Sequence, residues 1–197
     1  VLWDKGEREL AVQAYDEILD KLPNDRDALH AKELYYSEGG YDDRLCSFYE
    51  MRADAALDQN NIAEALSCLR KSAEVAETKL FDNERAISVL KRVVALDPTD
   101  PEPHRKIIAL YEAIGDDLGL AASMEALLAL TSRPAARCEI LSKLGRFYLD
   151  KLENYERAED CWKKVQTIQP RNPLVGEELS RVYAKQGDFD SLDKSLT

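Results

Sequence analysis

The apolar residues of this chain recur at helical spacing, and three stretches repeat one signature. A small residue is followed four positions later by a large apolar residue, then by a β-branched residue and finally by proline. The three copies are Ala11-Tyr15-Ile18-Pro23, Ala86-Leu90-Val93-Pro98 and Ala158-Trp162-Val165-Pro170. A small residue in an apolar stripe lets a neighbouring helix approach closely, and the proline ends the helix. The pattern therefore predicts a set of closely packed helices.

The last two copies belong to a longer repeat with a period of 72 residues. Residues 79–101 align with 151–173 without gaps, and nine of the 23 positions are identical. A weaker copy precedes the second one by 75 residues. A period of 72 residues corresponds to two helical hairpins of about 36 residues each, and repetition at a fixed period is typical of a solenoid.

Turn residues indicate where the helices begin and end. The expected helices cover 7–22, 26–38, 42–58, 61–80, 83–96, 102–115, 117–131, 134–150, 155–168 and 174–187, and another begins at 189. Because the connections are short, consecutive helices are antiparallel neighbours. We expect an all-α fold of about 10–11 helices in one domain over residues 1–197. Its hairpins are expected at roughly 1–22, 26–58, 61–98, 101–131, 134–170 and 173–197.

Residues 144–170 carry a nearly complete family pattern, with one extra residue in the turn at 152–154. The pattern consists of Leu144-Gly145, Tyr148, Tyr155, Ala158, Trp162, Val165 and Pro170. These residues resemble the tetratricopeptide repeat family, and weaker matches extend the resemblance over essentially the whole chain. The resemblance implies a right-handed α-solenoid. The apolar, uncapped start at Val1 suggests a fragment of a longer repeat protein.

Composition narrows the range of partners. The net charge of −11 and the isoelectric point of about 4.8 disfavour binding to the phosphate backbone of nucleic acids. No apolar run approaches the length of about 20 residues that a membrane span needs. The four cysteines stand alone in expected helices, where we interpret them as small buried hydrophobic residues. Unpaired cysteines favour a reducing, cytoplasmic location.

The sequence contains few residues that could support catalysis. The two histidines, His30 and His104, belong to no zinc-binding motif, and no glycine-rich phosphate loop is present. The cysteines do not have the spacing of a metal site. We therefore expect no catalytic residues, metal, cofactor or small-molecule substrate.

The resemblance also implies which residues face a ligand. In the family, the first helix of each hairpin lines a concave groove, and its second, fifth, ninth and twelfth positions face the ligand. This register places four residues of each hairpin on the groove, and among them the candidate site residues are Arg70, Arg105, Glu112, Ser142, Arg146, Glu177 and Arg181. The four arginines form a band of planar donors that suits the carboxylates and carbonyls of an extended peptide. Alternatively, Arg70–Glu74, Arg146–Asp150 and Glu177–Arg181 are local pairs that only steady exposed helices.

The predicted function is a non-catalytic scaffold that binds a protein or an extended peptide on this concave face. We expect the double variant Arg105→Ala/Arg146→Ala to lower partner affinity without moving the melting temperature. The alternative is an architectural spacer or a weakly self-associating segment. A groove whose charges only neutralise one another would favour the spacer. The lysines and asparagines with which some family members bind acidic chaperone tails are missing at the matching positions.

Overall fold

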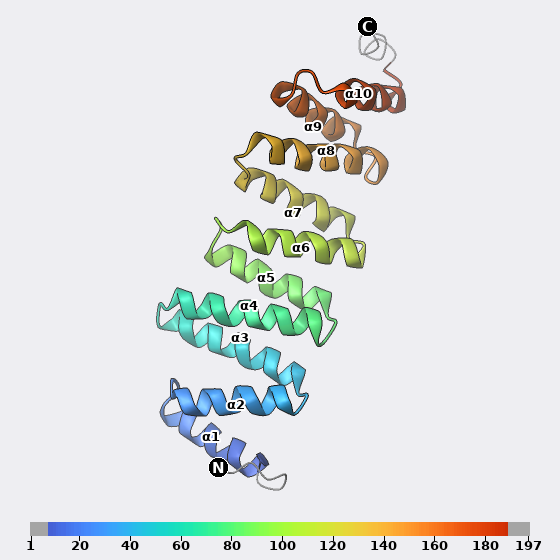
Figure 1. Cartoon of the computed structure of the whole chain (residues 1–197). Helices are drawn as coiled ribbons and strands as arrows, with labels where there is room; N and C mark the ends of the chain where they lie inside the picture. The colour runs from blue at the N-terminus through green and yellow to red at the C-terminus, as the bar shows by residue number, and fades with distance from the viewer. Residues whose placement is uncertain (1–7, 189–197) are drawn as a thin grey trace. The chain divides into compact units, whose positions relative to one another are not determined.

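The computed structural model describes residues 8–188, and all the secondary structure in this part of the chain is α-helical (Figure 1). The helices are α1 (Arg8–Lys21), α2 (Arg26–Glu38), α3 (Asp42–Asp58), α4 (Ile62–Thr78), α5 (Asn83–Leu96), α6 (Pro101–Ile114), α7 (Asp117–Leu130), α8 (Pro134–Asp150), α9 (Tyr155–Ile168) and α10 (Pro173–Gln186). The all-α class is confirmed, and each helix begins and ends within two residues of its predicted bounds. The helix expected from 189 lies outside the described residues.

Local capping explains why the bounds follow from the sequence. Asp25 accepts the backbone N–H of Ala28 at 2.9 Å, which satisfies a donor at the start of α2. At the ends of α6 and α10, Gly115 and Gly187 adopt left-handed conformations with φ of 75° and 73°. This conformation suits glycine because it has no Cβ, and it stops the helix at a fixed residue.

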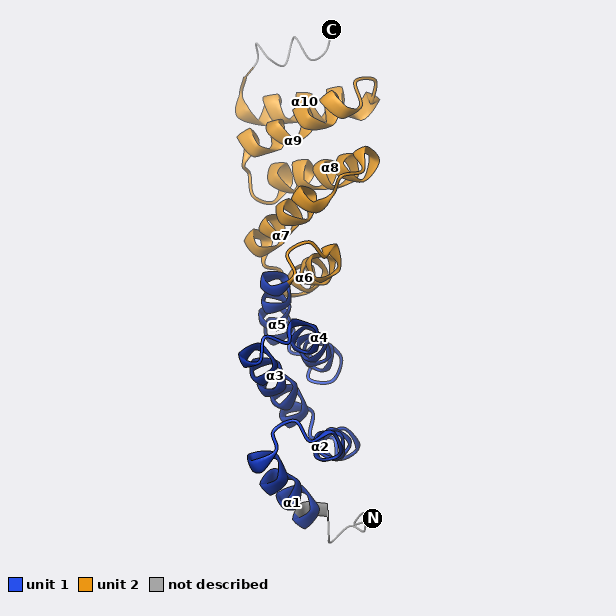
Figure 2. Cartoon of the chain, turned by 90° about the vertical axis from the view of Figure 1, so that its left-hand side faces the viewer, with its two compact units in different colours: residues 1–96 blue, residues 97–197 orange. Residues whose placement is uncertain are grey.

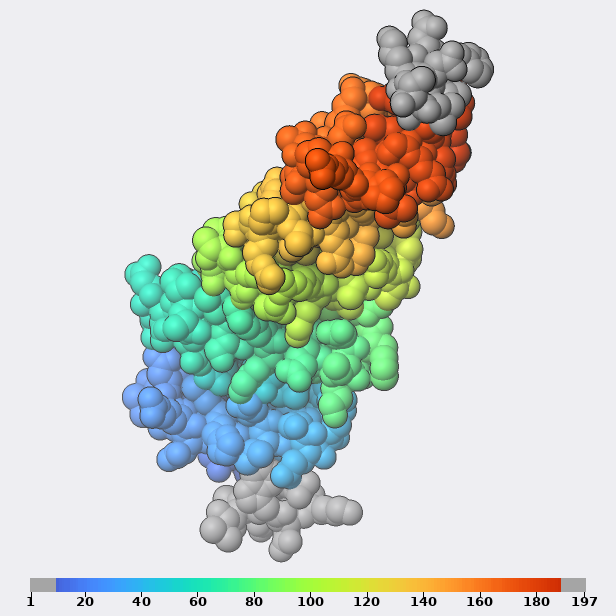
Figure 3. All heavy atoms as spheres, turned by 45° about the horizontal axis from the view of Figure 1, so that its top comes forward, coloured from blue at the N-terminus to red at the C-terminus, as the bar shows by residue number. Residues whose placement is uncertain are grey.

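The chain divides into two compact units, which Figure 2 shows in different colours. The first unit ends at Leu96 and contains α1 to α5, and the second begins at Asp97 and contains α6 to α10. Within each unit every helix packs against the next one along the chain. In the space-filling view the atoms of consecutive segments lie against one another (Figure 3). The single-domain organisation and the hairpin scheme remain predictions.

The repeated signature forms the core in two of its three copies. Ala86 and Val93 on α5, and Ala158 and Val165 on α9, are each 0% exposed. Trp162 on α9 is also buried and packs against Gly145 on α8, where a Cβ would lie 2.6 Å from the indole nitrogen. Gly145 is therefore required by the close approach of the two helices. The remaining copy, on α1, is more exposed: Ala11 is half-buried and Ile18 is 38% exposed.

Candidate protein-interaction surface

In the second unit, a hollow of about 310 Å³ lies between α6 and α8, with α7 at its floor. It is lined by Arg105, Ile108, Glu112, Met124, Leu127, Thr131, Ala136, Glu139, Ile140 and Lys143. We call it the α6–α8 hollow. Two of the site residues predicted from the sequence, Arg105 and Glu112, line it together.

The α6–α8 hollow combines an apolar floor with a charged rim. Met124 and Leu127 of α7 form the buried part of its lining. On the rim, Arg105 forms an ion pair with the nearby Glu102, and Lys143 Nζ lies 3.5 Å from Glu139 Oε1. Charges of both signs therefore surround an apolar centre, which suits a ligand that has both apolar and polar groups.

A second cluster of predicted residues surrounds a buried carboxylate that the sequence analysis missed. Arg146 of α8 donates from Nε to Glu178 Oε1 at 2.7 Å, and Arg181 of α10 donates from Nη1 to Glu178 Oε2 at 2.6 Å. Glu178 is only 4% exposed, so these two guanidinium groups take the place of the water that would otherwise solvate its carboxylate. The sequence does contain one indication of this pairing. Glu178 lies three residues before Arg181, a spacing that places both side chains on one face of a helix.

The partners of these arginines differ from the local pairs weighed from the sequence. Arg146 pairs with Glu178, and Asp150 instead accepts from Arg181 Nη2 at 3.1 Å. Lys185 Nζ also lies 3.5 Å from Asp150 Oδ1. Pairing of Arg146 with Glu178, and of Arg181 with Asp150, links α8 to α10. Long side chains reach the adjacent helix, so spacing within one helix does not decide their partners.

The other predicted site residues occupy separate positions. Ser142 is half-buried on α8, and Glu177 is exposed on α10. Arg70 is exposed on α4 and therefore belongs to the first unit, whereas the other three arginines belong to the second. The single arginine band across both units remains a prediction.

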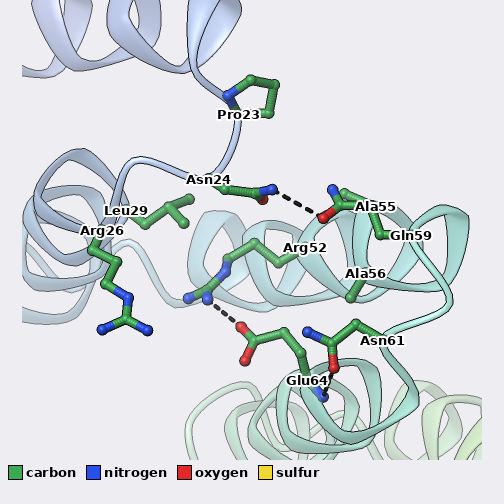
Figure 4. Close-up of a pocket in the computed structure, with 10 residues that line it drawn as sticks. All are labelled: Pro23, Asn24, Arg26, Leu29, Arg52, Ala55, Ala56, Gln59, Asn61 and Glu64. Carbon is green, nitrogen blue, oxygen red and sulfur yellow. Dashed lines mark hydrogen bonds and ion pairs between the residues drawn. The ribbon is translucent and has the colours of Figure 1, made fainter.

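The first unit contains a hollow of its own, about 320 Å³ in volume, that sequence reasoning did not find (Figure 4). It is lined by Pro23, Asn24, Arg26, Leu29, Arg52, Ala55, Ala56, Gln59, Asn61 and Glu64. Arg52 forms an ion pair with Glu64, and Asn24 Nδ2 donates to Gln59 Oε1 at 3.0 Å. The hollow depends on the turn between α1 and α2 meeting α3 and α4, which no local pattern specifies.

A polar network around Glu33 joins the helices that line this first hollow. Glu33 of α2 accepts from Tyr49 Oη of α3 at 2.7 Å and from Lys71 Nζ of α4 at 2.9 Å. Burial alone would raise the pKa of Glu33, but these hydrogen bonds outweigh burial and the pKa is lowered. The network therefore stabilises the arrangement of α2, α3 and α4 while Glu33 is ionised.

Burial shifts the pKa values of the cysteine thiols and of His104. All four cysteines are buried thiols, and burial raises the pKa of Cys68 and Cys161 to about 11. Since the thiolate is the reactive form, such thiols are weak nucleophiles at neutral pH. Burial also lowers the pKa of His104. Residues 8–188 contain no cluster of three or more side chains that could hold a metal ion.

None of the described helices α1 to α10 combines the length and the apolar character that crossing a membrane would require.

Comparisons with known proteins identify one segment. Residues 47–79 match the family described as tetratricopeptide repeat, and no curated protein matches the chain. Among solved structures, MamA is 21% identical with a TM-score of 0.45, covering 81% of this chain and 87% of its own. MamA from Desulfovibrio magneticus RS-1 is 18% identical with a TM-score of 0.41, covering 77% and 90%. A third structure contains the TPR-like repeats of a putative Podosopora anserina kinesin light chain, repeats that are nearly identical to one another. It is 18% identical to this chain with a TM-score of 0.46, and the match covers 86% of this chain and 90% of that chain.

Residues 47–79 comprise the later part of α3 and the whole of α4, although the expected hairpins separate these helices. α4 packs against both α3 and α5, so it has a neighbour on each side that could complete a hairpin. The resemblance inferred from the sequence is confirmed at residues 47–79, where the chain matches the tetratricopeptide repeat family.

Proposed function

We propose that the protein is a non-catalytic interaction scaffold and that the α6–α8 hollow binds an extended segment of a protein partner. The observation that carries this proposal is the convergence of Arg105 and Glu112 with an apolar floor in one hollow. An apolar side chain of the partner would fill the floor, and its backbone and charged groups would meet the rim. The helices around the hollow are already formed, so the cost of ordering falls mainly on the peptide.

The arginines around Glu178 extend this surface along α8 and α10. A guanidinium group has five N–H donors, so an arginine held by one carboxylate can still bind another acceptor. Arg146 uses Nε to bind Glu178 while its side chain remains 52% exposed. Glu178 thus fixes the orientation of Arg146 before a ligand arrives, and this favours recognition of a carboxylate or carbonyl oxygen.

A displayed library of short random peptides, selected on the full chain, tests the proposal. Arg105→Ala/Glu112→Ala removes one charge of each sign from the rim, and we expect it to weaken selected peptides by about tenfold or more. The matched control is Lys163→Ala/Glu156→Ala, which removes one charge of each sign from the exposed surface of α9. Equal weakening by both pairs, or none by either, would contradict binding at the α6–α8 hollow.

The double variant expected from the sequence is less suitable, because Arg146 has a structural partner. Arg146→Ala would leave the buried Glu178 with Arg181 as its remaining guanidinium partner. Removing one partner of a buried charge destabilises the fold. We therefore expect Arg105→Ala/Arg146→Ala to lower the melting temperature, unlike Arg105→Ala/Glu112→Ala.

The architectural spacer is the second candidate, and the ion pairs on this surface favour it. Arg105, Lys143, Arg146, Arg181 and Lys185 each lie beside a carboxylate of the same unit. These pairs, some within one helix and some between α8 and α10, form without any ligand. A library that yields no saturable binder, together with an unchanged oligomeric state at high concentration, would favour the spacer over the peptide-binding scaffold.

We also propose a cytoplasmic location, with protein partners and no cofactor. Four buried thiols without disulfides are compatible with a reducing compartment. Fractionation of the source cell, with detection by an antibody to the chain, tests the location. Recovery from an oxidising compartment would contradict it.

A further inference from the structure

The floor of the α6–α8 hollow has a methionine where the first unit has an aromatic ring. In the repeat, α2 and α3 are the equivalents of α6 and α7 at a distance of 75 residues, and α4 is the equivalent of α8 at 72. Met124 on α7 therefore corresponds to Tyr49 on α3. Tyr49 is 6% exposed, so its ring is part of the core of the first unit. The equivalent position of the second unit has no ring and lines a hollow instead.

The neighbours of Tyr49 show how the first unit holds this ring. The Tyr49 hydroxyl donates to Glu33 Oε1 of α2 at 2.7 Å, and Lys71 Nζ of α4 lies 5.2 Å from the centre of the ring. The equivalents of Glu33 and Lys71 in the second unit are Ile108 and Lys143, and both line the α6–α8 hollow. The second unit thus keeps the cation and has an apolar side chain in place of the hydroxyl's acceptor.

The lining of the hollow favours the ring of a phenylalanine. Its volume of about 310 Å³ is at the lower end of the range for ligand pockets, which suits one large side chain. A ring in the hollow would gain a sulfur–aromatic contact with Met124 and a cation–π contact with Lys143. Because Ile108 has no side-chain acceptor, a tyrosine hydroxyl would lose its hydrogen bonds to water without replacement.

The charges around the hollow favour a basic residue close to this ring. Arg105 is paired with Glu102. Lys143 is paired with Glu139, so both cations of the rim already have a carboxylate. Glu112 is exposed and forms no ion pair with any residue that the structure describes. It lies in the last turn of α6, where the negative end of the helix dipole adds to its charge.

The geometry of an extended chain sets the spacing between the ring and the basic residue. Ile108 lies beside the expected position of the ring, and Glu112 follows it by four residues on α6. Four residues of a helix span about 6 Å. In an extended peptide, side chains two residues apart point to the same side and are separated by about 6.6 Å. A basic residue two positions from the ring therefore reaches Glu112.

We propose that the α6–α8 hollow binds a phenylalanine of an extended partner segment, and that Glu112 binds a lysine or arginine two positions away from it. The inference rests on the proposed function, because it assigns a ligand to the hollow that was proposed to bind a peptide. It differs from the ligand expected from the sequence, since the carboxylate of Glu112 selects a basic group at this end of the hollow.

The synthetic peptide Ser-Arg-Ser-Phe-Ser-Arg-Ser is a suitable probe, because it presents a basic residue at the required spacing in both chain directions. Fluorescence anisotropy with the labelled peptide and the full chain measures binding, and we expect a dissociation constant in the micromolar range. Alanine in place of the phenylalanine should weaken binding by about tenfold or more. Glutamate in place of both arginines should weaken it by about tenfold, and tyrosine in place of the phenylalanine by about threefold.

Two variants of Met124 test the position of the ring. Met124→Phe places a ring in the hollow from α7, as Tyr49 does from α3 in the first unit. We expect it to weaken binding of the peptide by about tenfold or more, because the ring of the peptide is then excluded. Met124→Leu is the control, since it nearly conserves volume, and it should change the affinity by less than about threefold. Circular dichroism and thermal melts check that both variants are folded.

Two carboxylate variants test the position of the basic residue. Glu112→Gln removes the unpaired carboxylate of the hollow, whereas Glu156→Gln removes an exposed carboxylate of α9. The second variant controls for the general attraction of a basic peptide to a chain with a net charge of −11. We expect Glu112→Gln to weaken binding by about fivefold and Glu156→Gln by less than about twofold.

Equal effects of Glu112→Gln and Glu156→Gln, or unchanged binding by Met124→Phe, would overturn the proposal. A second outcome separates it from the proposed function. If the probe does not bind, but library peptides without this pattern bind and lose affinity in Arg105→Ala/Glu112→Ala, the hollow binds peptides and the assigned ligand is wrong. Absence of any saturable binder would overturn both.

Discussion

The three-helix blocks α3–α5 and α7–α9 share one ionic bridge but surround it differently. Arg85 of α5 binds Glu50 of α3, and Arg157 of α9 binds Glu125 of α7. In the first block the bridge continues into a buried polar cluster, where Ser72 Oγ donates to Glu50 at 3.2 Å and lies 3.1 Å from Cys46 Sγ. In the second block the bridge continues to the hydroxyl of Tyr148, which accepts from Arg157 Nη1 at 2.9 Å and donates to Glu125 at 2.7 Å.

The difference shows that two arginines at the same position of the repeat can contribute differently to stability. The side chain of Arg85 is 23% exposed, whereas that of Arg157 is 57% exposed. Arg85 therefore supports polar groups that have little access to water, and Arg157 lies on the surface. Equivalent positions in a repeat keep their geometry while their contribution to stability follows from what surrounds them.

Enlarging the small residue of the signature is the strongest test of the equivalence of the two blocks. Ala86 and Ala158 are both 0% exposed, so Ala86→Leu and Ala158→Leu overpack a close helix contact. We expect each to lower the free energy of unfolding by about 1–3 kcal/mol, more than any change in the α6–α8 hollow. Urea denaturation measures the effect, and the exposed Ala95→Leu on α5 is the control.

An unfolding curve of Ala86→Leu that matches the unmodified chain would contradict the close packing of this position. A large effect at Ala158 with none at Ala86 would show that the two blocks are not equivalent in their cores.

Removing the bridging arginines tests the difference between the blocks. Arg85→Ala leaves Glu50, which also accepts from the buried Ser72, without a guanidinium partner, and we expect a loss of about 1–3 kcal/mol in the free energy of unfolding. Arg157→Ala removes an exposed group, so its effect should be clearly smaller. Thermal melts of both variants show which one is destabilised more. Arg85→Lys keeps the positive charge and so separates the loss of charge from the loss of the guanidinium hydrogen bonds. The reverse order would show that exposure does not decide the role of the bridge.

The smallest expected effect concerns the pH dependence of the first unit. The pKa of Glu33 is lowered from its ordinary value of 4.5, so its ionised form stabilises the fold above that value. This contribution is lost as the pH falls through the lowered pKa, because the folded state must then protonate Glu33. Glu33→Gln should therefore weaken the pH dependence of the unfolding free energy below about 4.5. Urea denaturation across this range, with the exposed Glu38→Gln as control, measures it.

If Glu33→Gln left the pH dependence of the unfolding free energy below about 4.5 unchanged, other carboxylates would be responsible for it. The same change in Glu38→Gln would show that the loss of any acidic residue is sufficient, rather than the loss of the Glu33 network.

Much of the fold was predictable, because helix ends are set by neighbouring residues. Gly115 and Gly187 stop their helices through their own backbone conformations, and Asp25 caps α2 from one residue before it. The candidate site was predictable only in part. Arg105 and Glu112 meet in one hollow, but the role of Glu178 was missed because its partner Arg146 lies 32 residues away in the sequence.

The sequence by itself determined the ten described helices and their bounds, since each depends on contacts within a few residues. Only the tertiary structure decided which arginine binds which carboxylate, where the hollows lie and which copy of the signature is open. The reason is physical: burial and ion pairing depend on neighbours that are distant in sequence. Ile18 and Val165 occupy the same position in the signature, and only the packing around them makes one 38% and the other 0% exposed.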